Sequence, residues 1–342
     1  MVRLRKTQPH VDPGLRRVRS GSGFRYVDPS GSPASEADRQ RARSLAIPPA
    51  WQNVWICAEP AGRIQAVGVD DAGRMQYLYH PDWRSGRDRR KYERALDLAS
   101  AMPTLRRWVT VRLRARHIDE EFVLAAALRL LDLAAPRLGT PRYGRLHGSR
   151  GLITLQHRDV TITGDRVQLD FPAKSGVRAV MEVVDAPLAR ALRRLVAGSG
   201  SGSSAATATS NVLAVPSADG PARPLSPAQV VRAIAEATGR PGFTAKDFRT
   251  LKGTVVAAQA LARSEKPGTV READRLEREA IAEAAAVLCN TPTVARSSYV
   301  DPRVLSRWRR GQSVDVQRSG DAALVALLRR GQPSRSKGAR GR

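Results

Sequence analysis

Short apolar runs alternate with turn residues over residues 21–79, a pattern typical of strands in a small β-rich module. Gly, Pro and Asp separate the runs, and the residues between the first two runs include a helical pattern at 35–45. The expected strands lie at 24–27, 54–57, 64–67 and 75–79. We therefore expect a β-rich N-terminal domain at residues 21–90, preceded by a basic tail at residues 1–20.

A larger, mostly helical domain is expected at residues 91–320. It follows a charged stretch at 84–94, and apolar positions at 122–133 predict a buried helix face. β patterning then returns between residues 151 and 184, with runs at 152–155, 160–163, 167–171 and 177–184. Turn sequences at Gly164 and Lys174 predict an antiparallel meander with Lys174 at a hairpin tip. The whole chain therefore reads as an α+β protein.

The second half of this domain is expected to be helical after an interruption. Residues 197–224 are dominated by Gly, Ser, Ala and Thr, a composition that predicts a flexible insertion. Ser226 followed by Pro227 has the signature of a helix N-cap and first turn, and further helices are expected at 245–262 and 270–288. In the last segment, 321–342, the tail from residue 332 is basic and is expected to be disordered.

Tyr299 is expected about two turns inside a helix. Thr291 and Pro292 repeat the N-cap and first-turn signature that Ser226 and Pro227 carry, so a new helix should begin there.

The chain is strongly basic: it has 58 Lys and Arg residues but only 32 Asp and Glu residues, which gives a formal net charge of +26. Such a charge favours a polyanionic partner, of which duplex nucleic acid is the commonest. An arginine-rich composition without a function is the alternative.

Cys57 and Cys289 lie far apart and have no second ligand at metal spacing, which excludes zinc ribbons and CxxC redox sites. No apolar run is long enough for a membrane span, so we expect a cytoplasmic protein.

Two of the seven lysines, Lys174 and Lys246, stand at turns beside apolar elements. Lysine, unlike arginine, can have its pKa lowered far enough to release a proton. Both are candidate general acids, and two solvated surface lysines are the alternative.

Several segments resemble, in order, those of the type IB DNA topoisomerases of the compact bacterial and poxvirus-like branch. The catalytic segments correspond to AKSG at 173–176, FTAKDFRT at 243–250, and NTP at 290–292 followed by SYV at 298–300. RLG at 137–139, with Tyr143 and then GSRGLITL at 148–155, resembles the stretch with the family's first catalytic arginine. Residues 45–51, 62–68 and 73–80 resemble the branch's β-rich DNA-clamping domain.

The resemblance implies a catalytic domain with a three-stranded antiparallel sheet and an enzyme that relaxes supercoiled DNA. One strand is cut through a 3′-phosphotyrosyl intermediate, swivels and is resealed, with no ATP, metal or other cofactor. Tyr299 would be the nucleophile, Arg137 and Arg249 the arginines that clamp the phosphate, Lys174 the general acid and Lys246 its partner in proton relay.

Asn290 stands where eukaryotic and viral members carry His. An amide still donates a hydrogen bond to a phosphate oxygen but carries no positive charge, so a slower reaction is expected rather than a different one.

The resemblance also implies DNA contacts by Gln76, Tyr77 and Tyr79, because Gln can pair with adenine in the major groove. The alternative is that both tyrosines pack beneath the β-rich module. The implied partner is duplex DNA, bound by a monomer that closes as a clamp within the nucleoid.

Two other functions stay open. Tyrosine recombinases share the catalytic set but generally have His three residues before the second arginine, where this chain has Lys246 before Arg249. A non-enzymatic, basic DNA-binding protein would need only the charge.

Overall fold

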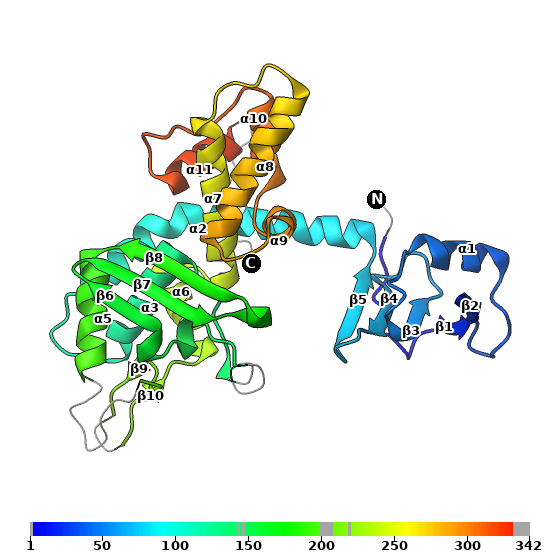
Figure 1. The fold of residues 1–342 in the computed structure, drawn as a ribbon, viewed down its shortest axis with the longest axis horizontal. Helices are drawn as coiled ribbons and strands as arrows, with labels where there is room; N and C mark the ends of the chain where they lie inside the picture. Colours follow the sequence, from blue (N-terminus) through cyan, green and yellow to red (C-terminus); the bar gives the residue numbers. More distant parts are fainter. Residues whose placement is uncertain (1–2, 142–143, 145–147, 199–207, 218–219, 331–342) are drawn as a thin grey trace, which may run out of the picture. The chain divides into compact units, whose positions relative to one another are not determined.

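The computed structural model describes residues 3–141, 144, 148–198, 208–217 and 220–330. The chain divides into two compact units, residues 1–90 and 91–342 (Figure 1). Within the described residues, no helix has the length and apolar character needed to cross a membrane.

The N-terminal unit is a five-stranded antiparallel sheet with strand order β2-β1-β3-β4-β5. Its strands are β1 (Gly14–Ser20), β2 (Gly23–Val27), β3 (Gln52–Cys57), β4 (Ile64–Val69) and β5 (Met75–Tyr79). The expected helix is α1 (Glu36–Ser44), which begins where the Ser35 side chain accepts the N–H of Asp38. Ala42 of this helix belongs to the same buried core as Leu15 and Ile56 of the sheet.

The prediction of a basic tail over residues 1–20 is wrong, because β1 lies inside the sheet between β2 and β3. Leu15 is buried, and Arg16, Arg17 and Arg19, which suggested a tail, are paired with residues of β2. Arg17, for example, donates to the carbonyls of Ile47 at 3.0 Å and Trp51 at 2.6 Å. Its charge ties β1 to the loop between α1 and β3, so the basic composition hid a strand.

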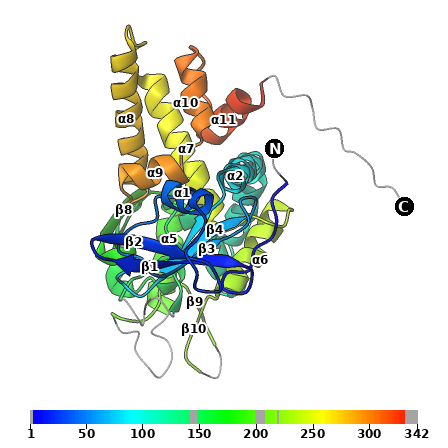
Figure 2. The same cartoon turned by 90° about the vertical axis from the view of Figure 1, so that its right-hand side faces the viewer.

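The larger unit is mostly helical, as expected. Its helices are α2 (Pro81–Arg112, which begins in the first unit), α3 (Glu120–Ala134), α5 (Ala186–Gly198), α6 (Pro227–Thr238), α7 (Ala245–Arg263), α8 (Val270–Val287), α9 (Pro292–Ser298), α10 (Pro302–Arg309) and α11 (Gly320–Arg329). Helix α7 lies beside α8, α10 and α11 in both views (Figures 1 and 2). Apolar side chains of α3 and α7, such as Phe122 and Phe248, are buried in one continuous core.

The three-stranded antiparallel sheet is confirmed, with β7 (Arg166–Pro172) between β6 (Val160–Thr163) and β8 (Arg178–Val184). The run at 152–155, expected as a strand, forms instead the 3-10 turn η1 (Leu152–Thr154). The backbone N–H groups of Leu152 and Ile153 donate to the carbonyls of Arg137 and Leu138. These bonds attach the turn to the Arg137 loop and remove it from the sheet.

The described part of residues 197–224 differs from the expected flexible insertion. Val212 and Leu213 are buried, and β9 (Ala214–Val215) pairs with β10 (Arg223–Pro224). A short apolar run within a polar, Gly- and Ser-rich stretch is enough to join the core, although the average composition hides it. Residues 199–207 and 218–219, like the expected disordered tail from residue 332, lie outside the described residues.

Candidate active site

The first turn of α7 carries the two basic side chains Lys246 and Arg249. Thr244 precedes the helix, and its backbone N–H and hydroxyl both donate to the Asp247 carboxylate, at 2.8 and 2.9 Å. Asp247 is fully buried and also accepts from Arg94 Nε at 2.7 Å. This polar anchor fixes the start of α7, so Lys246 points to solvent while Arg249 points into the protein.

The Arg249 guanidinium is held by two backbone carbonyls at helix ends. Nη1 donates to Ala135 at 2.6 Å and Nη2 to Leu288 at 2.8 Å, and the side chain is only 3% exposed. Burial lowers the pKa of Arg249, although the neighbouring Tyr299 phenol opposes this. The third guanidinium nitrogen, Nε, is buried without a hydrogen-bond partner among the described residues.

Asn290 is set in place by the end of α8. Cys289 has φ +47°, the left-handed conformation that normally favours Gly after a helix. The N–H groups of Cys289 and Asn290 then donate to the carbonyls of Ala286 at 3.0 Å and Ala285 at 2.9 Å, which is the Schellman pattern. The reversal of the chain directs Asn290 toward the Arg137 loop.

Arg137 meets Asn290 directly, because its Nη2 donates to Asn290 Oδ1. The loop carrying Arg137 is closely packed, and a Cβ on Gly151 would lie 2.5 Å from the Arg137 carbonyl oxygen. The Asn290 amide nitrogen is buried and, within the described part of the chain, makes no hydrogen bond. Asn290 therefore both receives a hydrogen bond from Arg137 and keeps a donor for another acceptor.

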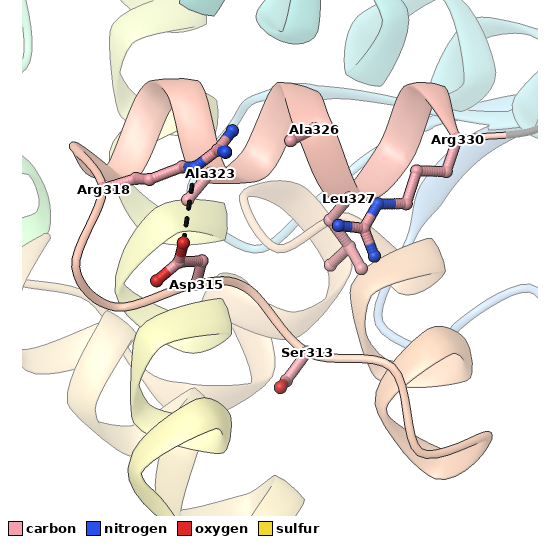
Figure 3. A pocket seen from close by; sticks show the side chains of 7 residues that line it. All are labelled: Ser313, Asp315, Arg318, Ala323, Ala326, Leu327 and Arg330. Atoms are coloured by element: carbon pink, nitrogen blue, oxygen red, sulfur yellow. Dashed lines mark ion pairs between the residues drawn. The ribbon is translucent and has the colours of Figure 1, made fainter.

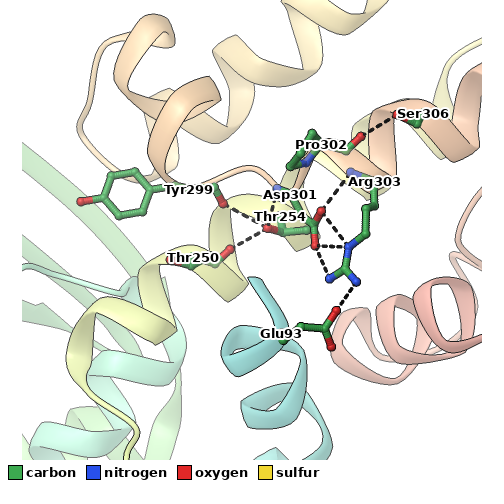
Figure 4. Close-up of polar contacts among 8 residues, drawn as sticks. All are labelled: Glu93, Thr250, Thr254, Tyr299, Asp301, Pro302, Arg303 and Ser306. Atoms are coloured by element: carbon green, nitrogen blue, oxygen red, sulfur yellow. Dashed lines mark hydrogen bonds and ion pairs between the residues drawn. The ribbon is translucent and has the colours of Figure 1, made fainter. Parts of the chain in front are cut away.

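Tyr299 lies at the end of α9 rather than inside a longer helix. The signature at Thr291 and Pro292 starts the helix as expected, but α9 ends at Ser298 and Tyr299 is its C-cap. The Arg249 guanidinium carbon lies 5.0 Å from the centre of the Tyr299 ring. In Figure 4 the phenol extends away from the polar contacts made by its own backbone.

The pKa of the Tyr299 phenol is lower than that of an ordinary tyrosine. Burial alone would raise this pKa, but the nearby Arg249 guanidinium and the positive charges of Arg137 and Lys246 outweigh burial. The cations around the phenol thus favour its ionised, nucleophilic form.

The backbone of Tyr299 is held against α7. A Cβ on Gly253 would lie 3.1 Å from the Tyr299 carbonyl oxygen and 3.2 Å from its Cβ, so this close approach requires a small residue. The Thr254 hydroxyl lies 3.0 Å from the Tyr299 carbonyl and accepts the N–H of Asp301 at 3.1 Å (Figure 4). One helix therefore positions both Arg249 and the tyrosine segment.

Lys174 lies in the 3-10 turn η3 (Lys174–Gly176) between β7 and β8, as expected for a hairpin tip, and its side chain is exposed. Among the described residues it has no hydrogen-bond or ion-pair partner. The structure thus brings together Arg137, Arg249, Asn290 and Tyr299, adds the charge of Lys246, and does not join Lys174 to them.

The expected DNA-contacting residues lie on β5, an edge strand of the N-terminal sheet. Tyr77 is 45% exposed, and its ring stacks at 6.1 Å on that of Tyr79, so Tyr77 does not pack beneath the module. Gln76 lies on the other face of the strand, and its amide nitrogen donates to Asp70. Side chains from both faces of an edge strand can reach one partner lying along that edge.

Comparison with known proteins identifies the family. Residues 80–310 match the family described as "Eukaryotic DNA topoisomerase I, catalytic core", and residues 23–70 match "Bacterial DNA topoisomerase IB, N-terminal domain". The chain belongs to the type IB DNA topoisomerases. The "DNA topoisomerase 1B" of Acanthamoeba polyphaga mimivirus is 26% identical over 331 residues, which cover 94% of this chain and 95% of the relative.

The resemblance seen in the motifs is thereby confirmed, and type IB topoisomerase activity on duplex DNA is supported over the recombinase and the non-enzymatic DNA-binding protein. The topoisomerase is accordingly an isomerase. Its described residues include no group of three or more His, Cys, Asp or Glu side chains arranged to hold a metal ion.

The pocket in Figure 3 is not part of this site. It is a hollow of about 50 Å³ lined by residues of α11 and the loop before it, where Arg318 and Asp315 form an ion pair at 3.3 Å. None of the residues expected to act in catalysis lines it. A type IB topoisomerase acts on a large duplex, so an open surface suits it better than an enclosed pocket.

Sequence reasoning missed Asp247, Gly253 and Thr254, whose contacts hold the start of α7 and the backbone of Tyr299 in place. A signal was present for Asp247, because Thr244 followed three residues later by an acidic residue is typical of a capped helix start. Gly253 and Thr254 gave no comparable signal, since their partners come from a distant part of the sequence.

Proposed function

We propose that Tyr299 is the nucleophile of this topoisomerase. Its Oη attacks a backbone phosphorus and forms a 3′-phosphotyrosyl ester, while the bond from phosphorus to the 5′ oxygen breaks. The 5′-hydroxyl later attacks the same phosphorus and the bond to Tyr299 Oη breaks, which releases the tyrosine and restores the strand, so no nucleotide is consumed. The observation that carries this assignment is the phenol beside Arg249, with its pKa lowered by three cations.

Arg249, Arg137 and Asn290 are proposed to stabilise the transition state. The attacked phosphate gains negative charge on its non-bridging oxygens, and fixed donors beside it lower the barrier. The buried, unpartnered donors Arg249 Nε and Asn290 Nδ2 support this role, because such groups are costly unless an acceptor arrives. Guanidinium groups stay charged at any working pH.

Lys174 is proposed to protonate the leaving 5′ oxygen, with Lys246 as its partner in proton relay. Lys174 lies at a hairpin tip and its side chain is exposed, which supports the proposal that it can reach a DNA strand. Lys246 lies three residues before Arg249, and its charge acts on Tyr299.

We also propose that the enzyme is a nucleoid-associated cytoplasmic monomer that closes as a clamp around DNA, with Gln76, Tyr77 and Tyr79 contacting the duplex. The net charge of +26 and the division into two units support this view. Sedimentation of the protein with a short duplex tests it, and a dimer on one cleavage site would contradict it.

The decisive test of the nucleophile is Tyr299→Phe. This variant should bind plasmid DNA with unchanged affinity but neither relax it nor form a covalent adduct, in buffer free of ATP and divalent metal. Tyr26→Phe, which makes the same change at a tyrosine in the core of the N-terminal unit, is the matched control and should relax plasmid. Full relaxation by Tyr299→Phe would reject the assignment.

The general acid is tested with a leaving group that needs no proton. Lys174→Ala should slow cleavage of an ordinary duplex by about 100-fold or more, but slow a 5′-thiolate leaving group far less. Lys266→Ala, which removes another exposed lysine, should leave both rates unchanged. Equal slowing of the two substrates by Lys174→Ala would reject the role.

A further inference from the structure

The Asp70 carboxylate organises the turn between β4 and β5. Its Oδ1 accepts the backbone N–H of Ala72 at 3.0 Å and of Arg74 at 2.9 Å, and Gly73 within the turn has φ +72°. The Asp70 side chain is only 16% exposed. This is the arrangement in which an Asp side chain replaces a backbone carbonyl and fixes a tight turn.

The second oxygen of Asp70 holds two side chains that point from β5 and the turn. Oδ2 accepts Gln76 Nε2 at 2.8 Å and Arg74 Nε at 3.0 Å. The hydrogen bond from Arg74 is the main cause that lowers the pKa of Asp70 to about 2, and the bond from Gln76 adds to it. Asp70 is therefore ionised at any working pH and can only accept hydrogen bonds.

A partner that only accepts decides which way the Gln76 amide faces. A glutamine amide can otherwise turn over about its last side-chain bond with little preference. With its nitrogen held at Asp70, the amide keeps its carbonyl oxygen and one N–H for another partner. One acceptor and one donor side by side are the complement of the N6 amino group and N7 of adenine in the major groove.

We propose that Asp70 is a positioning residue for sequence preference: it holds the Gln76 amide in the orientation that reads adenine. The inference rests on the proposed function, in which β5 contacts the duplex. It differs from that function because Asp70 touches neither DNA nor the reacting atoms. Holding the side chain before DNA arrives also reduces the entropy lost on binding.

The test variant is Asp70→Asn. Its remaining oxygen can still accept from Ala72 and Arg74 and keep the turn, whereas its amide nitrogen donates and cannot accept from Gln76. Asp70→Ser, whose hydroxyl also caps turns, is a second variant with the same expectation. Covalent adducts are trapped on duplexes with randomised bases around the cleavage site and then sequenced. The preference for adenine at the base contacted by Gln76 should fall roughly tenfold, while plasmid relaxation stays near that of the unaltered enzyme.

Three further variants separate positioning from other effects. Gln76→Leu should lose the same preference, and adding Asp70→Asn to it should change nothing more. Arg74→Met removes the other side chain bonded to Asp70 but keeps the Asp70–Gln76 bond, so it should leave the adenine preference intact. Retained adenine preference in Asp70→Asn and Asp70→Ser would overturn the proposal, as would a preference that Gln76→Leu does not alter. Failure of the proposed function itself would be seen separately, as relaxation that survives Tyr299→Phe.

Discussion

At Tyr299, burial and charge act in opposite directions on one phenol. Charge prevails, so the phenol should ionise below its ordinary pKa of 10 and cleavage should rise with pH until that point. Lys246→Met removes one of the three cations and should move the pKa upward. The measurement is the tyrosinate absorbance of the protein minus that of Tyr299→Phe, followed against pH. A midpoint above 10, or one that Lys246→Met does not move, would contradict this explanation.

Cys289 shows how one backbone conformation at a residue supports the site. It adopts φ +47° although it has a side chain, and left-handed backbone costs such a residue about 1–2 kcal/mol. Cys289→Gly should therefore raise the free energy of unfolding by about 1 kcal/mol, less any loss of the weak contact of its thiol with the Val180 carbonyl at 3.5 Å. Cys289→Ala is the control, because it loses the thiol but keeps the strained Cβ. The free energy of unfolding is measured by urea denaturation of the unaltered protein, Cys289→Gly and Cys289→Ala. An unchanged or lower value for Cys289→Gly would show that the backbone at Cys289 is not strained.

Among the elements, those with a local signal could be predicted from the sequence. The starts of α6 and α9 carry an N-cap residue followed by Pro, and the β6–β8 meander carries alternation and turn residues. Strand β1 and turn η1 could not, because the partners of Arg17 and of Leu152 come from other segments. A pattern within one segment contains no information about such partners.

The candidate site likewise has features that the sequence predicts and features that depend on distant contacts. The residue types at Arg137, Arg249, Asn290 and Tyr299 could be taken from family motifs. Their assembly depends on contacts between the ends of α3, α8 and α9 and the face of α7. Gly253, which lets the tyrosine segment approach α7, has a role that only the packed structure reveals.

For the whole molecule, the net charge overstates the number of basic side chains that are available to contact DNA phosphates. Many arginines of the larger unit are engaged internally, such as Arg106 with Asp132 and Asp321, and Arg303 with Asp301 and Glu93 (Figure 4). These pairs join elements that are distant in sequence. The salt dependence of DNA binding should therefore reflect only the arginines left for phosphate contacts.

Lys252 links the stability of the folded chain to pH. It lines a cavity of about 410 Å³ between α2, α3, α7 and α11, together with Arg106, Asp132 and Asp321. Burial lowers the pKa of Lys252 below its ordinary 10.5, although the two carboxylates oppose this. Between the lowered pKa and 10.5, the unfolded chain binds more protons than the folded chain, so stability rises with pH in that window. Below the lowered pKa, the cost of burying the charge is present in full.

Lys252→Met removes this cost while keeping a side chain of similar length. The variant should unfold at higher urea concentration than the unaltered enzyme at neutral pH, and its advantage should shrink as the pH rises toward 10.5. Lys266→Met, at an exposed position, is the control and should show no such trend. An advantage that stays constant across this pH range would mean that packing, and not the buried charge, is responsible; a loss of stability at neutral pH would mean that attraction to Asp132 and Asp321 outweighs burial.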